Sequence, residues 1–164
     1  MKETSVAAVM TRPVCTIHAN ERLDKALFLF QKNRISILPV VNTSGCCVGV
    51  ITLKDIIDKQ NEIIAECRIR GCIVDENQLQ PLPEVPLNFF GEISVHDGMT
   101  ENFYLIREDQ TVSECIDLLL QHQIHHLPVV NLDNRLVGVV SSIDLVDYLR
   151  LYMLESEQQD NVTA

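Results

Sequence analysis

The sequence contains no long apolar run. None of its 164 residues lie in a stretch that approaches the roughly 18 uncharged apolar residues of a membrane-spanning helix. The first residues, MKETSVAAVM, also lack the apolar centre of a signal peptide. We therefore expect no membrane association and a cytoplasmic location.

Basic residues are scarce relative to acidic ones. The chain has 13 Lys and Arg against 23 Asp and Glu, which gives a formal net charge of −10. Binding to nucleic acid or anionic lipid needs clustered cations, because much of its free energy comes from released counterions. The composition therefore argues against a nucleic-acid or membrane partner. An anionic ligand would need a local site made by helix N-termini and a few cations.

Common metal-binding and catalytic motifs are also missing. The six cysteines include no Cys-x-x-Cys pair, and the adjacent Cys46 and Cys47 are poorly placed to share a disulfide or a metal. A metal site at His122, His125 and His126 is the less favoured alternative, because their spacing matches no common zinc pattern. No Gly-x-Ser-x-Gly, P-loop or His-Glu-x-x-His motif occurs. We predict reduced thiols, no metal site and no enzymatic activity.

What the sequence does contain is an internal repeat. The pentapeptide LPVVN occurs at residues 38–42 and again at 127–131, an offset of 89 positions. Between 38–58 and 127–147, 10 of the 21 aligned positions are identical. The same offset relates Met10-Thr11 to Met99-Thr100, Gly49 to Gly138 and Asp55 to Asp144. Two copies are too few for a solenoid, so the repeat indicates a pseudo-symmetric pair.

Each copy predicts an amphipathic helix near its start. Apolar residues recur at the spacing i, i+3, i+4, i+7 from Leu23 in the first copy and from Val112 in the second. Thr111 and Glu114 have the spacing of a capping box. The first copy lacks this box and must be capped otherwise, with Asn20 as a candidate.

The remaining elements of each copy give the order β-α-β-β-α. A short strand is predicted before each helix, and a strand, a polar turn and a second strand are predicted after it. Pro39 and Pro128 have no N–H to donate, so their strands are expected at a sheet edge or to begin late. The second helices are predicted over residues 53–69 and 142–157.

The repeat also predicts the domain organisation of an α/β (α+β) protein. The segment between the copies contains Leu87, Phe89 and Phe90, which we expect to pack against the rest of the chain. The predicted parts are the first repeat over residues 1–60, a helix end and proline-containing linker over 61–94, the second repeat over 95–157 and a disordered tail over 158–164.

Both hairpins end in the pattern Gly-φ-φ-Thr/Ser-x-x-Asp, in which φ is apolar. It occurs at Gly49–Asp55 and at Gly138–Asp144. One interpretation is helix capping by the hydroxyl and the carboxylate. The other is a ligand site, because a helix N-terminus binds phosphate, an Asp beside it can accept from a ribose diol, and Gly permits close backbone approach. The recurrence in both copies favours the ligand site.

These features together resemble tandem cystathionine β-synthase (CBS) domains, which form a Bateman module. The shared motifs are Met-Thr at the start of each copy, Leu-Pro-Val-Val in its middle and Gly-φ-φ-Thr/Ser-x-x-Asp before its last helix. The resemblance covers about residues 6–60 and 95–150. It implies two pseudo-symmetric β-α-β-β-α repeats packed through their sheets, with adenosine-containing ligands bound in clefts between the copies.

The resemblance also implies roles for individual residues. Thr52 and Asp55 would contact the phosphate and ribose at one site, and Ser141 and Asp144 would do so at the other. The strands that begin each copy would offer backbone groups and apolar walls to adenine. The full set of candidate ligand-binding residues is Cys15, Thr16, Ile17, Arg34, Pro39, Thr52, Asp55, Tyr104, Leu105, Ile106, His125, His126, Pro128, Ser141 and Asp144.

The two implied sites are expected to be unequal. The gamma subunit of AMP-activated kinase has a His-Arg pair that contacts phosphates, where this chain has His125-His126. A titratable group thus replaces a permanent cation. The first copy has Ser36-Ile37 there, with Arg34 as the nearest cation.

The resemblance implies a stand-alone regulatory module that binds AMP, ADP, ATP or S-adenosylmethionine and transmits occupancy to an unidentified protein, with no tightly bound cofactor. The alternative is a ligand-independent dimerisation or interaction module with vestigial nucleotide sites. A homodimer is expected through apolar residues of the second helices, namely Ile56, Ile57, Ile63 and Ile64 in one and Leu145, Val146, Leu149 and Met153 in the other.

Overall fold

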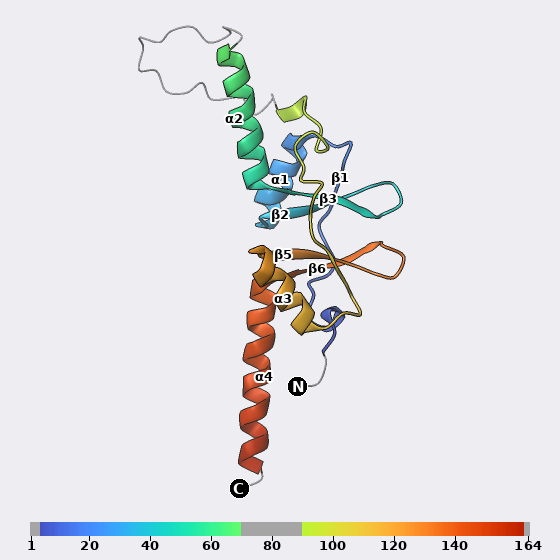
Figure 1. Ribbon diagram of the computed structural model, residues 1–164, viewed down its shortest axis with the longest axis vertical. Coiled ribbons are helices and arrows are strands. Elements are labelled where there is room, and N and C mark those ends of the chain that lie inside the picture. The colour runs from blue at the N-terminus through green and yellow to red at the C-terminus, as the bar shows by residue number, and fades with distance from the viewer. Residues whose placement is uncertain (1–3, 70–89, 163–164) are drawn as a thin grey trace, which may run out of the picture. The chain divides into compact units, whose positions relative to one another are not determined.

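The computed structural model describes residues 4–69 and 90–162 and has the predicted mixed α+β composition (Figure 1). Each repeat shows the order β-α-β-β-α that the hydrophobic pattern predicts. The elements are η1 (Val6–Ala8), β1 (Ile17–His18), α1 (Leu23–Asn33), β2 (Ile37–Val41), β3 (Cys47–Thr52), α2 (Leu53–Ile69), β4 (Ile106–Arg107), α3 (Val112–His122), β5 (His126–Val130), β6 (Leu136–Ser141) and α4 (Ser142–Val162).

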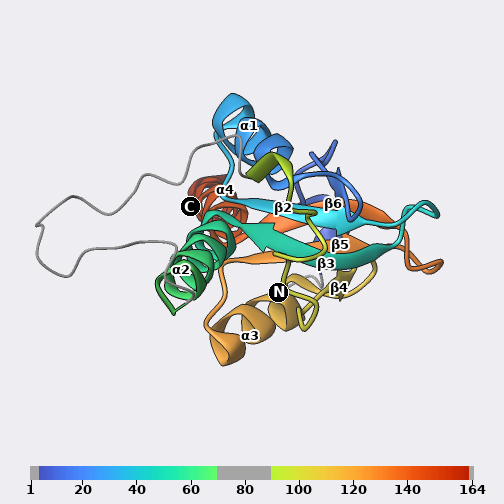
Figure 2. The ribbon, with the colours of Figure 1, turned by 90° about the horizontal axis from the view of Figure 1, so that it is seen from above.

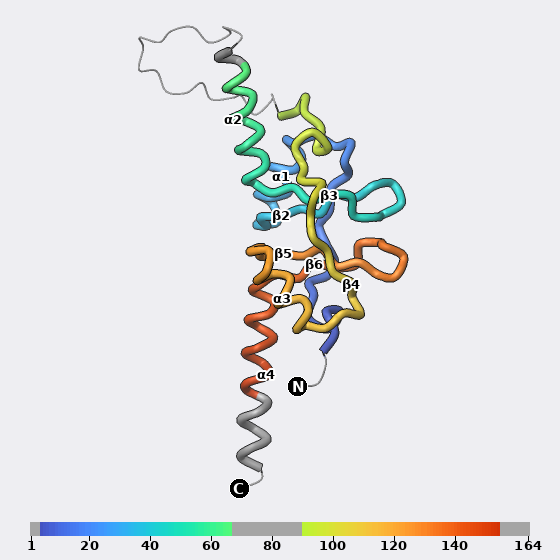
Figure 3. Tube along the Cα trace, viewed as in Figure 1, coloured from blue at the N-terminus to red at the C-terminus, as the bar shows by residue number. Residues whose placement is uncertain are grey.

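The chain divides into two compact units that do not coincide with the contiguous repeats. Unit 1 contains residues 1–14, 44–47 and 104–164, and unit 2 contains residues 15–43 and 48–103. Each unit therefore includes a segment that precedes the first strand of the other repeat. In unit 1, Thr11 pairs with Val139 of β6, and in unit 2, Thr100 pairs with Val50 of β3. Figure 3 traces the chain through β3 and β6, the strands that take part in these pairs.

Each unit has a three-stranded sheet, with the strand orders β1-β2-β3 and β4-β5-β6. The first two strands of each sheet are parallel, and β5 and β6 form an antiparallel hairpin (Figure 2). Pro39 and Pro128 thus lie in central strands, so the expected edge position is wrong. The parallel pairing begins one residue later, at Val40 and Val129, so neither proline interrupts it.

The first helix of each repeat packs its apolar stripe into the core of its unit. Leu23, Ala26 and Phe30 of α1 are buried, and so are Val112, Cys115 and Leu119 of α3 at equivalent positions. No buried side chain among the described residues is polar or charged. The two helices, each of 11 residues, thus bury equivalent apolar stripes.

The two first helices begin differently. Thr111 caps α3 in a capping box with Glu114, as the sequence predicts. The prediction of Asn20 for α1 is wrong, because the N-cap is Arg22, whose side chain makes no capping hydrogen bond. Instead, the N–H of Leu23 donates to the carbonyl of Ile93 at 3.0 Å. The segment that enters unit 2 thus replaces the missing cap.

The second helices, α2 and α4, follow their hairpins without an intervening loop. The bounds of α2 agree with the predicted range, whereas α4 continues to Val162. Phe90 is buried in the core of unit 2, as expected, while Leu87 and Phe89 lie outside the described residues. No helix in the described part of the chain has the length and hydrophobicity to cross a membrane.

Candidate functional site

The N-terminus of α2 brings together the first pair of candidate residues. One carboxylate oxygen of Asp55, Oδ2, accepts the backbone N–H of Thr52 at 2.7 Å and its hydroxyl at 2.6 Å. The backbone N–H of Asp55 lies 3.2 Å from the same hydroxyl oxygen. Both side chains are partly buried. This reciprocal capping holds the carboxylate in one orientation at the start of the helix.

The N-terminus of α4 repeats this arrangement in unit 1. Asp144 Oδ2 accepts the Ser141 backbone N–H at 2.7 Å and the Ser141 hydroxyl at 2.6 Å. The N–H of Asp144 again lies 3.2 Å from the hydroxyl oxygen. The capping interpretation of the motif is therefore correct in both units. It leaves the ligand interpretation open, because each aspartate uses only one of its two oxygens for the cap.

The second carboxylate oxygen has a partner that the sequence reasoning missed. The hydroxyl of Thr100 donates to Oδ1 of Asp55 at 3.0 Å, and the hydroxyl of Thr11 donates to Oδ1 of Asp144 at 2.9 Å. These threonines come from the Met-Thr pairs that repeat at the common offset. That recurrence was the one sequence signal that pointed to them.

The glycine of each motif makes room for the methionine of the same pair. A Cβ on Gly49 would lie 2.8 Å from the Sδ of Met99 and 3.1 Å from the carbonyl oxygen of Thr100. A Cβ on Gly138 would overlap the Sδ of Met10. The space that each glycine leaves is thus taken by a methionine side chain of the protein itself.

The histidine pair of unit 1 lies beside the start of α4. His126 pairs with Ser141 across the β5–β6 hairpin, and the carbonyl of His125 accepts the N–H of Ser142 at 3.0 Å. His125 is exposed and His126 is half-buried. Burial lowers the pKa of His126, His125 lowers it further, and Asp144 opposes this shift. His126 is therefore harder to protonate than an ordinary histidine.

The strand that opens each repeat provides side chains of different kinds. Ile17 and Ile106 are fully buried in the two cores, so only their backbone groups remain for a ligand. Thr16 is half-buried and Leu105 is exposed. Pro39 and Pro128 are buried in the central strands.

Two equivalent contacts differ between the units. The ring of Tyr104 stacks on that of His122, with centroids 3.6 Å apart. At the equivalent positions in unit 2, the amide nitrogen of Asn33 lies 3.4 Å from the sulfur of Cys15. Burial raises the pKa of the Cys15 thiol, and Lys32 lowers it to a lesser extent. One unit thus offers an aromatic platform where the other has a small thiol.

The cation expected in unit 2, Arg34, follows α1 in the left-handed conformation with φ 54°. It lines a largely apolar hollow of about 670 Å³ on unit 2. Leu53, the first residue of α2, also lines this hollow, so the guanidinium side chain and the start of α2 belong to one surface depression. The other lining residues are Asp24, Leu27, Phe28, Phe30, Gln31 and Ile35.

The described residues offer no arrangement for a metal ion. No group of three or more His, Cys, Asp or Glu side chains among them is placed to coordinate one. His122 instead stacks on Tyr104. Cys115 is a core residue, as predicted, and burial raises the pKa of its thiol to about 11, with Asp144 contributing.

Comparisons with known proteins agree with the observed architecture. The family model described as "CBS domain" matches residues 6–62 and 91–151. An uncharacterized protein of Methanocaldococcus jannaschii is 29% identical over 158 residues, covering 86% of this chain and 88% of its own. A homoserine O-acetyltransferase of Methanococcoides burtonii is 29% identical over 145 residues, but this chain spans only 24% of that enzyme.

Solved structures show the same fold. The CBS domain pair of the protein MJ0100, in complex with 5′-methylthioadenosine and S-adenosylmethionine, is 25% identical with a TM-score of 0.63, covering 93% of this chain and 98% of its own. The protein CBSX2, in complex with AMP, has a TM-score of 0.69 at 22% identity and covers 92% of this chain and 98% of its own.

Proposed function

The chain belongs to the CBS domain family, and on this basis we propose that it is a regulatory module that binds an adenosine-containing ligand. Each unit would bind through the Thr/Ser-x-x-Asp segment at the start of its second helix. The ligand phosphate or equivalent polar group would face the helix N-terminus, and the ribose would face the aspartate.

The observation that best supports this proposal is the set of contacts that holds the carboxylates of Asp55 and Asp144 in place. Each carboxylate is held by a cap through Oδ2, partly buried, and presented at a helix N-terminus. A carboxylate offers about four acceptor positions. Because the protein supplies three donors to each, one position remains on Oδ1 for a ligand hydroxyl.

The choice of ligand class draws on the related structure of MJ0100, which contains 5′-methylthioadenosine and S-adenosylmethionine. These ligands share an adenosine group and differ in the substituent at the 5′ position. We therefore propose AMP, ADP, ATP or S-adenosylmethionine as the effector. The two sites would differ in preference, because only unit 1 has the histidine pair and the Tyr104 platform.

We propose regulation rather than catalysis because the candidate residues form binding contacts and caps. The hydroxyls of Thr52 and Ser141 are each engaged in a helix cap with the aspartate three residues further on. The protein that would respond to ligand occupancy is unidentified. The alternative, a ligand-independent interaction module, predicts the same fold and the same caps, so only a binding experiment separates the two.

A thermal-shift panel with AMP, ADP, ATP, NAD and S-adenosylmethionine tests the proposal. A ligand that binds only the native state stabilises it by about 2.7 kcal/mol at a concentration of 100 times its Kd. We expect at least one adenosine compound to raise the unfolding midpoint in a concentration-dependent way. An unchanged midpoint with every compound would favour the interaction module.

The histidine pair predicts a pH dependence of nucleotide affinity at unit 1. A phosphate placed next to His125 and His126 favours the imidazolium form, so binding takes up a proton and is tighter at lower pH. Each coupled histidine is expected to contribute about 1 kcal/mol, or about fivefold in affinity. The pKa of His126 is lowered in the protein without ligand. The affinity gained by protonating this histidine should therefore continue to grow below about pH 6.5.

Calorimetry with AMP at about pH 5.5 and pH 8 checks this pH dependence on the wild type and on His125→Gln/His126→Gln. The double variant is expected to lose most of the dependence. A residual effect of opposite sign is expected at the acid end, because the phosphate itself gains a proton near pH 6. The same pH dependence in both proteins would remove the histidines from the site.

We also propose a homodimer through α2 and α4, with a smaller set of residues than the sequence predicts. Ile56 and Leu145 are buried in their own units and are not available. Ile143, Val146 and Leu149 recur on α4 at 73%, 62% and 54% exposure. On α2, which belongs to the other unit, Ile57 is exposed, while Ile63 and Ile64 are half-buried. A contiguous stripe of this kind is typical of a protein interface.

Light scattering is expected to show a dimer at high micromolar concentration. Val146→Glu/Leu149→Glu should shift the protein toward a monomer, because each new charge would have to be desolvated at the interface. Leu132→Glu is the matched control, since Leu132 is 76% exposed in the turn between β5 and β6. A wild-type monomer would contradict the dimer, and so would a dimer that both variants leave unchanged.

A further inference from the structure

Thr11 and Thr100 contact the two candidate ribose-binding aspartates from distant parts of the chain. The Thr100 hydroxyl reaches Asp55 over 45 residues of sequence, and the Thr11 hydroxyl reaches Asp144 over 133. The capping partners Thr52 and Ser141, by contrast, are three residues from their aspartates. Capping alone therefore gives no reason for the two long-range contacts.

The backbone holds both threonines firmly in position. Thr100 and Val50 exchange two backbone hydrogen bonds, of 2.8 and 3.1 Å. Thr11 and Val139 exchange two, of 2.8 and 3.2 Å. The preceding methionine packs against the motif glycine in each unit. Each hydroxyl is thus presented to its carboxylate by a fixed segment of chain.

The direction of these hydrogen bonds has a chemical consequence. A threonine hydroxyl has one proton and two acceptor lone pairs. Because the proton is donated to the carboxylate, the threonine oxygen can only accept from a ligand. Asp55 Oδ1 and Thr100 Oγ1 are then two acceptors 3.0 Å apart, and Asp144 Oδ1 and Thr11 Oγ1 are 2.9 Å apart.

We propose that Thr11 and Thr100 determine the specificity of the two sites for a ribose diol. Each orients the free oxygen of its aspartate and supplies the second of two adjacent acceptors. One ribose hydroxyl would donate to the aspartate and its neighbour to the threonine. This inference rests on the proposed function, and it adds one threonine to the ribose contact of each aspartate.

A structural role alone predicts a different result. If the threonines only fix the segments at 10–11 and 99–100, their removal would weaken all ligands equally. If they bind the diol, their removal would weaken a ribonucleotide more than its 2′-deoxy analogue. The ratio of the two affinities therefore separates the two roles.

Calorimetry on the full chain with AMP and 2′-deoxy-AMP measures this ratio. If the panel selects the S-adenosyl class, 5′-methylthioadenosine and its 2′-deoxy analogue replace them. We expect the wild type to prefer the ribose form and Thr11→Val/Thr100→Val to bind AMP about tenfold more weakly, about 1.4 kcal/mol. The double variant should also lose most of the preference.

Two further variants serve as controls for this test. Thr11→Ser/Thr100→Ser retains the hydroxyls and should retain the preference, even where its unfolding midpoint falls. Thr43→Val removes an exposed hydroxyl in the turn between β2 and β3 and should change neither affinity. An unchanged ribose preference in the double valine variant would overturn this role alone. A wild type that binds no adenosine compound would overturn the proposed function and this role with it.

Discussion

Replacing both Asp55 and Asp144 with asparagine is expected to lower the affinity for the adenosine ligand by about 100-fold. Hydrogen bonds to charged groups contribute roughly 1.5–3 kcal/mol, and about 1.4 kcal/mol corresponds to tenfold in affinity. Asparagine keeps the size of the side chain and one carbonyl oxygen for the cap, so the helix start should persist. The loss would therefore come from the ligand contact.

The single variants should separate the two sites. Asp144→Asn is expected to leave binding at unit 2 intact, and Asp55→Asn to leave binding at unit 1 intact. Calorimetric stoichiometry measures both. If the two sites are unequal, as the different side chains at Tyr104 and Cys15 suggest, the two single variants will retain sites of different affinity.

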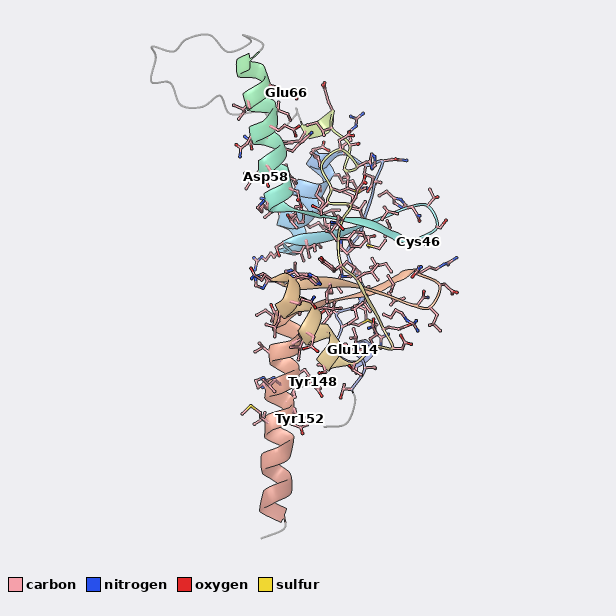
Figure 4. All side chains as sticks on the ribbon, viewed as in Figure 1. Cys46, Asp58, Glu66, Glu114, Tyr148 and Tyr152 are labelled. Carbon is pink, nitrogen blue, oxygen red and sulfur yellow. The ribbon has the colours of Figure 1, made fainter. Side chains whose placement is uncertain are left out.

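The chain offers matched controls one turn further along the same helices. Asp58, labelled in Figure 4, is exposed and pairs with Lys54 at 2.6 Å, and Asp147 is exposed and pairs with Arg150 at 2.8 Å. Asp58→Asn/Asp147→Asn makes the same change of charge away from the helix starts. We expect its affinity to equal that of the wild type. If Asp55→Asn/Asp144→Asn binds the ligand as tightly as this control, Asp55 and Asp144 do not contact the ligand.

A chain cut to residues 1–70 is expected to lose its cooperative fold, although it contains the whole first repeat. In unit 2, Val95 is completely buried and Phe90 is 4% exposed, and both are absent from this fragment. Burying a large apolar side chain contributes about 1.5–3 kcal/mol. The net stability of a small protein is only about 5–15 kcal/mol, so these losses are severe.

The fragment also loses backbone hydrogen bonds that complete unit 2. The N–H of Val95 donates to the carbonyl of Glu21 at 2.7 Å, and Thr100 exchanges two bonds with Val50. Each such bond contributes about 1 kcal/mol net. Circular dichroism should show a fragment with little helix and no sharp thermal transition. A monomeric fragment with a cooperative melt would contradict the unit boundaries.

A second fragment serves as the control for chain length. Residues 15–103 include Phe90, Val95 and Thr100 as well as α1, β2 and α2. We expect this fragment to be more helical per residue than residues 1–70. Equal helicity in the two fragments would mean that the segment over 90–103 contributes nothing to unit 2.

The sequence predicted the local elements well because their signals are local. The apolar stripes after Leu23 and Val112 defined α1 and α3, and Thr111 with Glu114 defined a cap. The start of α2 at Leu53 followed from the motif that precedes it. Periodicity and capping need only a few neighbouring residues, so they can be read without knowledge of the tertiary fold.

The errors concern groups whose partners are distant in the sequence. Asn20 was expected to cap α1, but the carbonyl of Ile93 takes that role. Pro39 was expected in a strand that lies at a sheet edge or begins late, but β2 begins at Ile37 and is the central strand, because it also pairs with the short strand β1. Neither result depends on residues near the affected element. Long-range pairing therefore set the limit of what the pattern could predict.

The sequence likewise predicted only those residues of the candidate site that belong to a local motif. The motif located Thr52, Asp55, Ser141 and Asp144, and the structure brings each pair together at a helix start. The second partners, Thr11 and Thr100, were visible only as a repeated Met-Thr pair with no assigned role. Thr11 precedes the first repeat but belongs to unit 1, and Thr100 precedes β4 but belongs to unit 2. Their contacts with the aspartates depend on this exchange of segments between the repeats.

Calorimetric titration of the full chain with AMP, ADP, ATP and S-adenosylmethionine tests the central claim most directly. We expect saturable binding of at least one of these ligands, with one or two sites per chain, and loss of that binding in Asp55→Asn/Asp144→Asn. Absence of binding by all four ligands to the folded wild type would contradict it, as would binding that the double variant retains unchanged.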